Sequence, residues 1–497
     1  MERQMVSIGP LWASRSEEEL RELAQIKRFM ECVSGDPAFR TALSEQPNNL
    51  TQVARERNIN IDVEGLLPLF HRNYSHLRAD KDDDRWPLAR KWDAYMNELL
   101  TMRSTIRNAG STASSNPVFN AWRNRQIARV QSELGERSTS IVHPLVAYEL
   151  SQGCTVGCWF CGVSAEKFSG YWPFTAENEQ KWRSTLQVMN RHFGEAAQTG
   201  FCYWATDPSD NPDYVKFLEA FHAVTGIVPQ TTTAAPLKNI EQTRKVLKLF
   251  DETRHVLNRF SILSVGQLRR VHSTFTADEL LGVELVLQQK GAFSGKALAG
   301  RALRRSPTSS TPSASGSDAA DSNSSNSTIA CVTGFLINMV EGRIRLVSPT
   351  KSSERWPDGY IVFGEARFEN ALQLSNAIEA LVEIHMIPRL AKNRRLSFRD
   401  DLEFLEKPFG FALGNQSATI ECKGPDWLLR VGKIVKQGNL TVSQAVIKLA
   451  SQGTSPFWTM KCLEDLYQAG LLEEAACSRP PAAVSEDPRF TVHQSTA

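Results

Sequence analysis

Apolar residues at helical spacing dominate the first part of the chain. A capping box of Ser16 and Glu19 predicts the start of a helix. Gly35 predicts its end, and Asp36-Pro37 supplies the cap and first turn of a second helix. The same pattern recurs over residues 85–107 and 122–134, on either side of a Ser/Asn/Gly linker at 108–117. We therefore predict a helical N-terminal region over residues 1–140. The apolar face of the first helix is formed by Leu20, Leu23, Ile26, Phe29, Met30 and Val33.

From Ile141 the pattern changes to short apolar, β-branched runs that alternate with helical stretches. "IVHPLVAYEL" predicts a strand, and "GFCYWAT", "IVPQTTTA" and "RFSILSV" each precede a predicted helix, before a last run, "VELVLQ". The helices are expected over 212–224 and 240–250 and from Gln267 onward. A strand–helix alternation of this kind is typical of a parallel sheet covered by helices. We predict an α/β barrel or partial barrel over residues 141–303.

The rest of the chain divides by composition. Residues 304–328 are rich in Ser, Asn and Asp, cannot enter a core, and are predicted to be a disordered insertion. Residues 329–367 are predicted to complete the barrel, with a hairpin of "ACVTGFLINMVEG" and "RIRLVSP" through Glu341-Gly342, and a strand "GYIVF". Residues 368–478 are predicted to be helical and to end in a helix-turn-helix or winged-helix piece. A disordered tail is expected over 479–497.

Composition and charge narrow the class of protein. A chain of 497 residues predicts two to four domains. Its net charge of +2 gives no basic footprint for nucleic acid or an anionic membrane surface. No apolar run is long enough to span a bilayer, and the N-terminus lacks a signal-peptide core. We therefore expect a cytoplasmic protein without nucleic-acid or membrane partners.

Three of the nine cysteines lie in "GCTVGCWFCG", at Cys154, Cys158 and Cys161. A structural zinc site needs four protein ligands, and no second Cys or His pair supplies the fourth. A dithiol redox site would leave Cys154 without a role. A [4Fe–4S] cluster held by three thiolates keeps one iron open for another ligand. The glycines at 153 and 157 are expected to let the backbone fold tightly around such a group.

The spacing C-x3-C-x2-C, with Phe160 before the last cysteine, resembles the signature of the radical S-adenosylmethionine (radical SAM) superfamily. "ELSQGCTVGCWFCGVSAEKFSG", "FCYWATDPSDNPDY", "PQTTTA", "RFSILS", "VELVLQ" and "CVTGFLINMV…SPTKSSERWPDGY" together resemble the proteusin-type radical SAM peptide epimerases. The resemblance covers residues 148–363, and more weakly the N-terminal helices. It implies an α/β fold with a partial (βα)6 barrel, flanked by a helical N-terminal region and a helical or winged-helix-like C-terminal region.

The resemblance also implies a reaction. A reduced [4Fe–4S] cluster on Cys154, Cys158 and Cys161 would cleave S-adenosylmethionine to a 5′-deoxyadenosyl radical. The radical would take the Cα hydrogen of an L-residue in a ribosomal precursor peptide, and a cysteine thiol would return hydrogen from the opposite face to give a D-residue. The implied partners are the leader and core of the precursor, which the helical termini are expected to help hold, and an electron donor such as flavodoxin or ferredoxin.

The donor thiol is predicted to be Cys331, because it would enter the site from the last barrel strands, opposite the cysteine loop. The other cysteines have simpler interpretations: Cys32 and Cys462 as helix packing, Cys202 as a buried strand residue, and Cys477 as part of the tail. Cys422 would reach the barrel only if the C-terminal region covers it. One departure from the family concerns Thr350, which stands where a relative can have cysteine. If that is the donor position, inversion is lost here or the thiol comes from elsewhere.

Further site residues are predicted at the ends of the barrel strands, where barrel active sites lie. In "ATDPSDNPD" they are expected to bind the methionine ammonium of the cofactor, although an Asx-Pro turn explains the same residues. In the next strands they are expected to contact ribose or carboxylate, although strand propensity and strand initiation explain them as well. The candidates are Thr206, Asp207, Asp210 and Asn211, then Gln230, Thr232, Arg259 and Ser261.

Two alternatives stay open. One is another radical modification of a peptide, such as C-methylation or desaturation. The other is a non-catalytic peptide-binding or helix-turn-helix regulator that retains a structural cluster. Uptake of solvent deuterium at Cα distinguishes the first from an epimerase, and formation of 5′-deoxyadenosine distinguishes the second from an enzyme.

Overall fold

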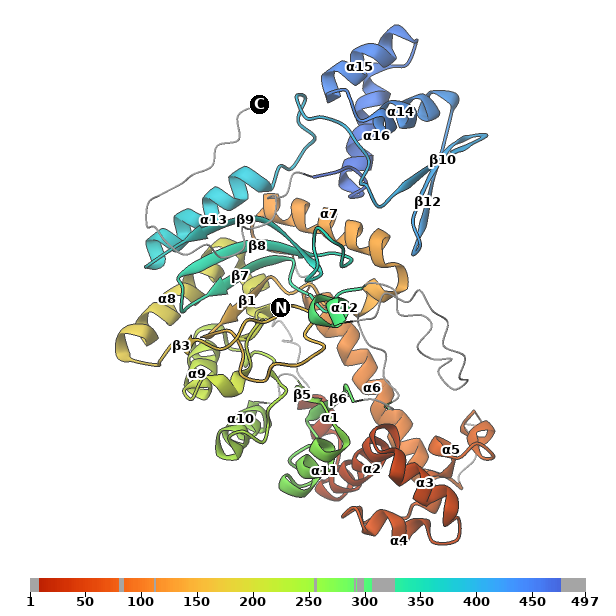
Figure 1. Ribbon diagram of the computed structural model, residues 1–497, viewed down its shortest axis with the longest axis vertical. Helices are drawn as coiled ribbons and strands as arrows, with labels where there is room; N and C mark the ends of the chain where they lie inside the picture. Colours follow the sequence, from red (N-terminus) through yellow and green to blue (C-terminus); the bar gives the residue numbers. More distant parts are fainter. Residues whose placement is uncertain are drawn as a thin grey trace.

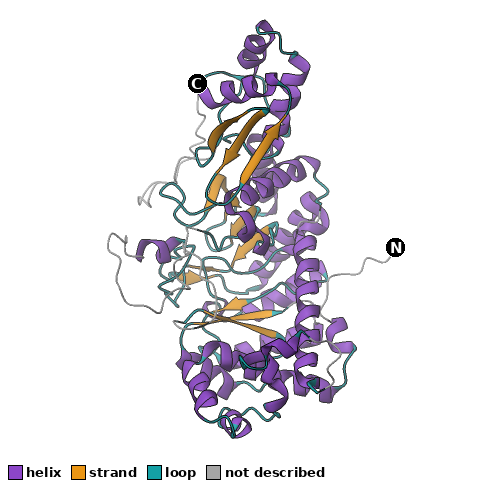
Figure 2. Cartoon of the chain, turned by 90° about the vertical axis from the view of Figure 1, so that its right-hand side faces the viewer, coloured by secondary structure: helices purple, strands orange, loops and turns teal. Residues whose placement is uncertain are grey.

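The structure is a computed structural model that describes residues 9–79, 85–110, 113–253, 257–289, 292, 299–305 and 327–474. It is a mixed α/β protein with several separate sheets. Most helices of the N-terminal region lie at one end of the long axis, the two larger strand groups of residues 146–367 lie in the middle, and a second group of strands and helices lies at the other end (Figures 1 and 2). The last N-terminal helix, Pro117–Leu134, lies beside the strands in the middle (Figure 1). The expected site residues belong to the middle part.

The N-terminal helices form as predicted. The capping box of Ser16 and Glu19 is made in both directions, and Asp36 ends one helix while its carboxylate accepts from the first turn of the next. The apolar face packs into its own core around Phe29, Phe39 and Trp92. The helices are α1 (Gly9–Ala13), α2 (Glu17–Gly35), α3 (Pro37–Glu45), α4 (Leu50–Arg55), α5 (Leu67–Phe70), α6 (Pro87–Gly110) and α7 (Pro117–Leu134). Helix α6 continues into the expected linker, and α7 begins earlier than expected because Asn116 caps it.

The larger sheet of the middle part has the order β1-β7-β8-β9. Strands β1 (Val146–Glu149) and β7 (Gly334–Asn338) are parallel. The predicted hairpin of β7 and β8 (Arg343–Pro349) is confirmed, and β9 (Tyr360–Arg367) extends it antiparallel. One face of the sheet packs under α8 (Ala176–Phe193), α9 (Tyr214–Thr225) and α13 (Ala371–His385). The opposite face, here called the inner face, carries Ala147, Leu336, Val347 and Val362.

A second sheet of β4 (Thr232–Thr233), β5 (Asn258–Ile262) and β6 (Val283–Leu287) is parallel throughout. Its helices are α10 (Ile240–Thr253) and α11 (Val265–Thr274), both as predicted. The expected strand "GFCYWAT" is reduced to a single parallel bridge between Phe201 and Ala147. Among the described residues before α13, the strands therefore form these two sheets and a short pair, β2 (Ser151–Gln152) and β3 (Gly170–Tyr171), where the sequence predicts one barrel-forming sheet.

Only the ends of the predicted Ser-rich insertion, residues 304–305 and 327–328, are among the described residues. Residues 306–326 lie outside the described residues. Arg304 belongs to the short helix α12 (Gly300–Arg305), and Thr328 donates its hydroxyl to the carbonyl of Gly359 at 2.6 Å. The ends of the predicted insertion are thus part of the fold. The predicted tail over 479–497 also lies outside the described residues.

The C-terminal part differs from the all-helical prediction. Strands β10 (Glu403–Lys407), β11 (Gly410–Gly414) and β12 (Thr419–Lys423) form an antiparallel sheet in that order. Helices α14 (Asp426–Gln437), α15 (Val442–Ser451) and α16 (Pro456–Gln468) follow and share one core with it. The two C-terminal helices were predicted, but the three strands before them were not. The C-terminal part is therefore a mixed unit of three strands followed by three helices.

None of the described helices combines the length and the apolar character that crossing a bilayer requires.

Candidate functional site

The cysteine loop follows directly from β1 through the short strand β2 (Ser151–Gln152), which pairs with β3 (Gly170–Tyr171). The amide of Cys154 donates to the carbonyl of Glu166 at 2.9 Å, and the amide of Cys161 donates to the carbonyl of Cys158 at 3.2 Å. Gly153 and Gly157 both have positive φ angles, of 71° and 62°. The expected tight turns are therefore present, and glycine is the residue that adopts them without strain.

Three cysteine side chains match the ligand type of an iron–sulfur cluster, but the structure favours the thiol over the metal-binding thiolate at two of them. Burial raises the pKa of Cys154 to about 12, with Asp207 and Asp210 adding to the effect, and it raises the pKa of Cys158 to about 11. Amide groups already point at sulfur, as in the bond from Ala165 N to Cys161 Sγ at 3.3 Å, and such bonds stabilise thiolates in iron–sulfur sites. Among the described residues, no three His, Cys, Asp or Glu side chains are close enough to hold a metal ion. The loop would have to draw its thiols together on binding.

The carboxylate of Asp210 connects the cysteine loop with the segment that follows Phe201. Its buried carboxylate accepts from the amide of Thr155 at 2.9 Å and from the hydroxyl of Thr155 at 2.5 Å. Lys238, just before α10, donates to the same carboxylate at 2.6 Å. One carboxylate thus joins three segments that were predicted to meet at this end of the barrel.

Asp207 is also buried, and its bonds lead to the second sheet. It accepts from Thr233 Oγ1 and from the amide of Ala234, both at 2.8 Å. Burial raises the pKa of this carboxyl group. Asn211 donates to the carbonyls of Leu150 and Trp172, both at 2.9 Å, so its amide holds the strand that leads into the cysteine loop. Asp207 and Asn211 therefore hold neighbouring segments together. The interpretation as an Asx-Pro turn accounts for their local bonds but not for these longer-range ones.

Gln230 and Thr232 meet at a tyrosine that the sequence analysis did not select. The phenol of Tyr203 donates to Gln230 Oε1 at 2.5 Å and accepts from Thr232 Oγ1 at 2.9 Å. Gln230 also donates to Thr232 Oγ1 at 3.0 Å. Burial raises the pKa of Tyr203 to about 12, so the phenol keeps its hydrogen.

The other residues predicted to bind the cofactor do not form a common hydrogen-bonded group like that of Gln230 and Thr232. Arg259 on β5 pairs with Glu284 of β6 at 2.9 Å. Burial opposes its charge, but Glu284 holds the pKa of Arg259 above its ordinary value. Thr206 and Ser261 are partly exposed, and Phe160 packs edge-on against Trp159 in the cysteine loop, with 5.4 Å between the ring centroids.

Cys331 lies against the inner face, just before β7. It packs with Tyr203, Trp204 and Tyr360 on the cluster around Ala147 and Leu336, and it also touches the end of α7. Burial raises the pKa of Cys331 to about 12, although Arg259 acts to lower it. The thiol is therefore protonated at neutral pH, and it lies on the face of the strand that leads into the cysteine loop.

Thr350 has a different environment. Its hydroxyl donates to Glu133 Oε2 at 2.8 Å, and its amide donates to the carbonyl of Gly359 at 2.9 Å. Thr350 is buried between the end of β8 and helix α7. In this chain the position serves to connect the sheet with α7.

Sequence reasoning missed a polar group on the inner face. Glu149 accepts from the amide of Ala205 at 3.1 Å and lies 3.8 Å from the guanidinium of Arg345. Tyr360 lies beside both, and its ring is edge-on to Trp204, whose indole N–H is buried without a partner. The available signal was Glu149 itself, a single acidic residue in the apolar run "VAYEL", because a buried strand seldom carries an unpaired carboxylate.

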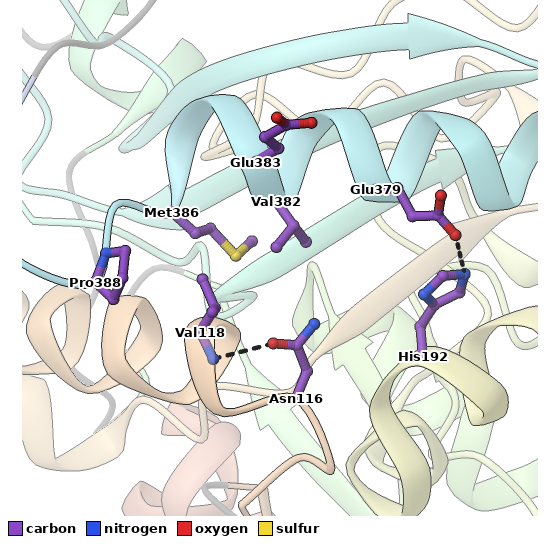
Figure 3. A pocket seen from close by; sticks show the side chains of 8 residues that line it. All are labelled: Asn116, Val118, His192, Glu379, Val382, Glu383, Met386 and Pro388. Atoms are coloured by element: carbon purple, nitrogen blue, oxygen red, sulfur yellow. Dashed lines mark hydrogen bonds and ion pairs between the residues drawn. The ribbon is translucent and has the colours of Figure 1, made fainter.

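Two cavities among the described residues lie away from the site residues. One of about 300 Å³ lies on the helix-covered side of the large sheet, between α7, α8 and α13. Figure 3 shows His192 pointing at Glu379 across it. Another of about 480 Å³ lies between α1, α2 and the second sheet. Neither contains an expected cofactor residue.

Comparison with known proteins places the chain in a family without assigning a reaction. No family model matches it. A search of solved structures found a partial likeness to BtrN in complex with AdoMet and 2-DOIA, with a TM-score of 0.22 and 11% identity over 29% of this chain and 57% of that one. The chain is 41% identical over 461 residues to the uncharacterized protein y4wI of Sinorhizobium fredii (strain NBRC 101917 / NGR234), which spans 93% of this chain and 89% of the relative. It therefore belongs to the same family as y4wI.

Proposed function

We propose that the chain is a radical S-adenosylmethionine epimerase that converts L-residues to D-residues in a ribosomally made precursor peptide. The observation that carries the proposal is the position of a protonated thiol, Cys331, on the inner face of the sheet whose first strand leads into the three-cysteine loop. A site of this kind has one set of thiols to hold a cluster and a separate thiol to donate hydrogen. The two sheets would form the partial (βα)6 barrel around it.

Cys154, Cys158 and Cys161 would hold a [4Fe–4S] cluster, which, when bound, supplies the electron that generates the 5′-deoxyadenosyl radical from S-adenosylmethionine. The side chains of the strand ends would orient the cofactor. Asp210 keeps the cysteine loop against α10, and the partly exposed Gln230, Thr232 and Ser261 offer hydroxyl and amide groups. Phe160 and Thr206 would contact the cofactor from the first and second strand ends.

Cys331 would finish the reaction. The thiol would give a hydrogen atom to the carbon-centred radical at Cα, which a thiolate could not do. The S–H bond breaks, a C–H bond forms, and one electron from the flavodoxin or ferredoxin donor with one solvent proton would return the resulting thiyl radical to the thiol. The high pKa of Cys331 keeps that hydrogen in place at neutral pH. Cys331 precedes β7, and the cysteine loop follows β1, so the two sets of thiols belong to neighbouring strands of one sheet.

The C-terminal unit would hold the leader of the precursor. In the described part of the chain, β12 pairs only with β11, so its other edge is open to a further strand. Addition of a peptide strand to an open sheet edge is a common mode of recognition. Leader and core would then bind to different parts of one chain, and an electron donor such as flavodoxin or ferredoxin would act at the cysteine loop.

The test uses the full chain, reconstituted anaerobically with iron and sulfide and given reductant and S-adenosylmethionine in D₂O. The substrates are candidate precursor peptides, taken from any short reading frames beside its gene. We expect 5′-deoxyadenosine and one solvent deuterium at Cα for each D-residue. Cys331→Ala should still form 5′-deoxyadenosine but no D-residue. Cys462→Ala is the matched control, because burial also raises the pKa of Cys462 to about 12 but this thiol lies in the C-terminal unit.

Three results would count against the proposal. Without any 5′-deoxyadenosine from the wild type, the chain is no radical enzyme. Full inversion by Cys331→Ala would exclude Cys331 as the donor, and a methylated or unsaturated product would assign another radical reaction.

A further inference from the structure

A single arginine far along the chain binds the backbone of the cysteine loop. Helix α12 lies against the loop, and the amide of Arg301 donates to the carbonyl of Cys161 at 2.9 Å. The guanidinium donates through Nη1 to the carbonyl of Cys158 at 3.2 Å and through Nη2 to the carbonyl of Ala165. One residue therefore donates to three carbonyls of the loop, and those of Cys158 and Cys161 also accept a bond from an amide within the loop.

The approach of α12 to the loop is close and depends on glycine. Gly300 has a φ of 56°, and a Cβ at this position would lie 2.5 Å from the carbonyl oxygens of both Cys161 and Gly162. Its amide donates to the carbonyl of Pro357 at 2.7 Å, which ties the helix to the turn before β9. The loop is thus held from outside by a segment that belongs to another part of the barrel.

The arrangement of the Cys158 and Ala165 carbonyls suits the planar, positively charged guanidinium of arginine. A guanidinium presents several N–H donors in a fixed fork, so it can bind carbonyls in different directions at once, whereas a lysine ammonium acts as one point. It also brings a positive charge to Cys158, where a thiolate-bound cluster would bring negative charge. Residues that hydrogen-bond to the metal-binding segment without touching the metal typically change the metal affinity about 10- to 100-fold when they are mutated.

We propose that Arg301 is the positioning residue of the cysteine loop, fixing the carbonyls of Cys158, Cys161 and Ala165 so that the three thiols can take up the iron–sulfur cluster. This inference rests on the proposed function for the identity of the cluster. The hold of Arg301 on the loop itself does not depend on it.

The experiment compares Arg301→Ala and Arg301→Lys with the wild-type chain. Arg304→Ala is the matched control, because Arg304 lies on the same short helix but is exposed and pairs with Asp358 at 3.4 Å. After anaerobic reconstitution, iron and sulfide retained against a chelator are measured. We expect about a ten-fold weaker retention in Arg301→Ala, a smaller loss in Arg301→Lys, and none in Arg304→Ala.

A second measurement uses the metal-free proteins. Alkylation by iodoacetamide is followed at each cysteine by mass spectrometry. We expect Cys158 and Cys161 to react about ten-fold faster in Arg301→Ala, because the loop opens more often once its carbonyl bonds are lost, while Cys331 reacts at the wild-type rate. A thermal melt confirms that each variant is folded, and Arg301→Lys serves if the alanine variant is not.

Equal iron retention and equal alkylation in wild type and Arg301→Ala would overturn the inference, as would an equal effect of Arg304→Ala. If the wild type itself takes up no iron, the proposed function fails, and alkylation of the metal-free proteins still decides whether Arg301 holds the loop.

Discussion

At the scale of single residues, burial in the fold keeps the imidazole ring of His143 uncharged. The ring is buried just before β1, and its Nδ1 lies 2.8 Å from Thr333 Oγ1. Burial, together with Arg123 and Arg129, lowers the pKa of His143 from 6.5 to about 3. The unfolded chain therefore binds a proton between these pH values and the folded chain does not, which makes the folded state less stable as pH falls.

The expected result is a difference in pH dependence. Relative to His143→Asn, the wild type should lose about 1.4 kcal/mol of unfolding free energy per pH unit below pH 6.5. Asparagine is chosen because His143 has a φ of 55°, which asparagine tolerates. Urea unfolding between pH 5 and 7 measures the effect, with the exposed His76→Asn as control. Parallel curves for wild type and His143→Asn would show that the histidine titrates normally.

The role of a residue could be predicted from the sequence only where its partners lie within the same short segment. The cysteine spacing and its glycines define the loop by themselves. Asp210 was selected because of its position after a strand, but its bond to Thr155 depends on two segments that meet only in the fold. The contact of Arg301 with Cys158 joins residues 143 positions apart, and no pattern within one segment reports it.

At the scale of elements, helix α7 connects the large sheet with the C-terminal unit. Arg129 donates to Glu133 at 2.6 Å on its own helix, and to Ser348 Oγ at 2.9 Å and the carbonyl of Pro349 at 2.6 Å on β8. Arg125, one turn earlier, pairs with Glu474 at 2.8 Å and stacks over Tyr467. The charged face of one helix thus serves two different neighbours.

We expect Arg129→Met to lower the unfolding free energy by about 3–5 kcal/mol, because it leaves the buried carboxylate of Glu133 without its nearest partner. Thermal or urea unfolding measures the loss. Gln131→Met on the same helix is exposed and should change stability little. A loss below 1 kcal/mol in Arg129→Met would mean that Arg399, which lies 3.8 Å from Glu133, is sufficient alone.

The capped helices were predictable because Ser16, Glu19 and Asp36 act within one turn. The sequence analysis did not predict strands β10 to β12. A strand forms by pairing with another segment, and the pattern within one segment does not reveal that partner. The burial of β12 alternates, yet β11 is buried along its whole length under α14, and such a run does not distinguish a strand from a helix.

At the scale of the whole molecule, the proposed leader site and the proposed reaction site belong to different parts of the chain. Hydrogen–deuterium exchange of the full chain, with and without the leader peptide, can locate the first. We expect slower exchange at Thr419–Lys423, because an added strand would bond the open edge of β12. Protection confined to the N-terminal helices would contradict a role for this edge.

The pairing of β1 with β7 has a consequence for how the protein is made. Val146 lies beside Phe335, so about 190 residues must leave the ribosome before the first strand meets its neighbour. Until then the cysteine loop lacks the neighbouring strands β7, β8 and β9 of the large sheet. Metal insertion is therefore expected after synthesis of the middle part is complete, and a chain arrested before Gly334 would expose three reactive thiols to oxygen.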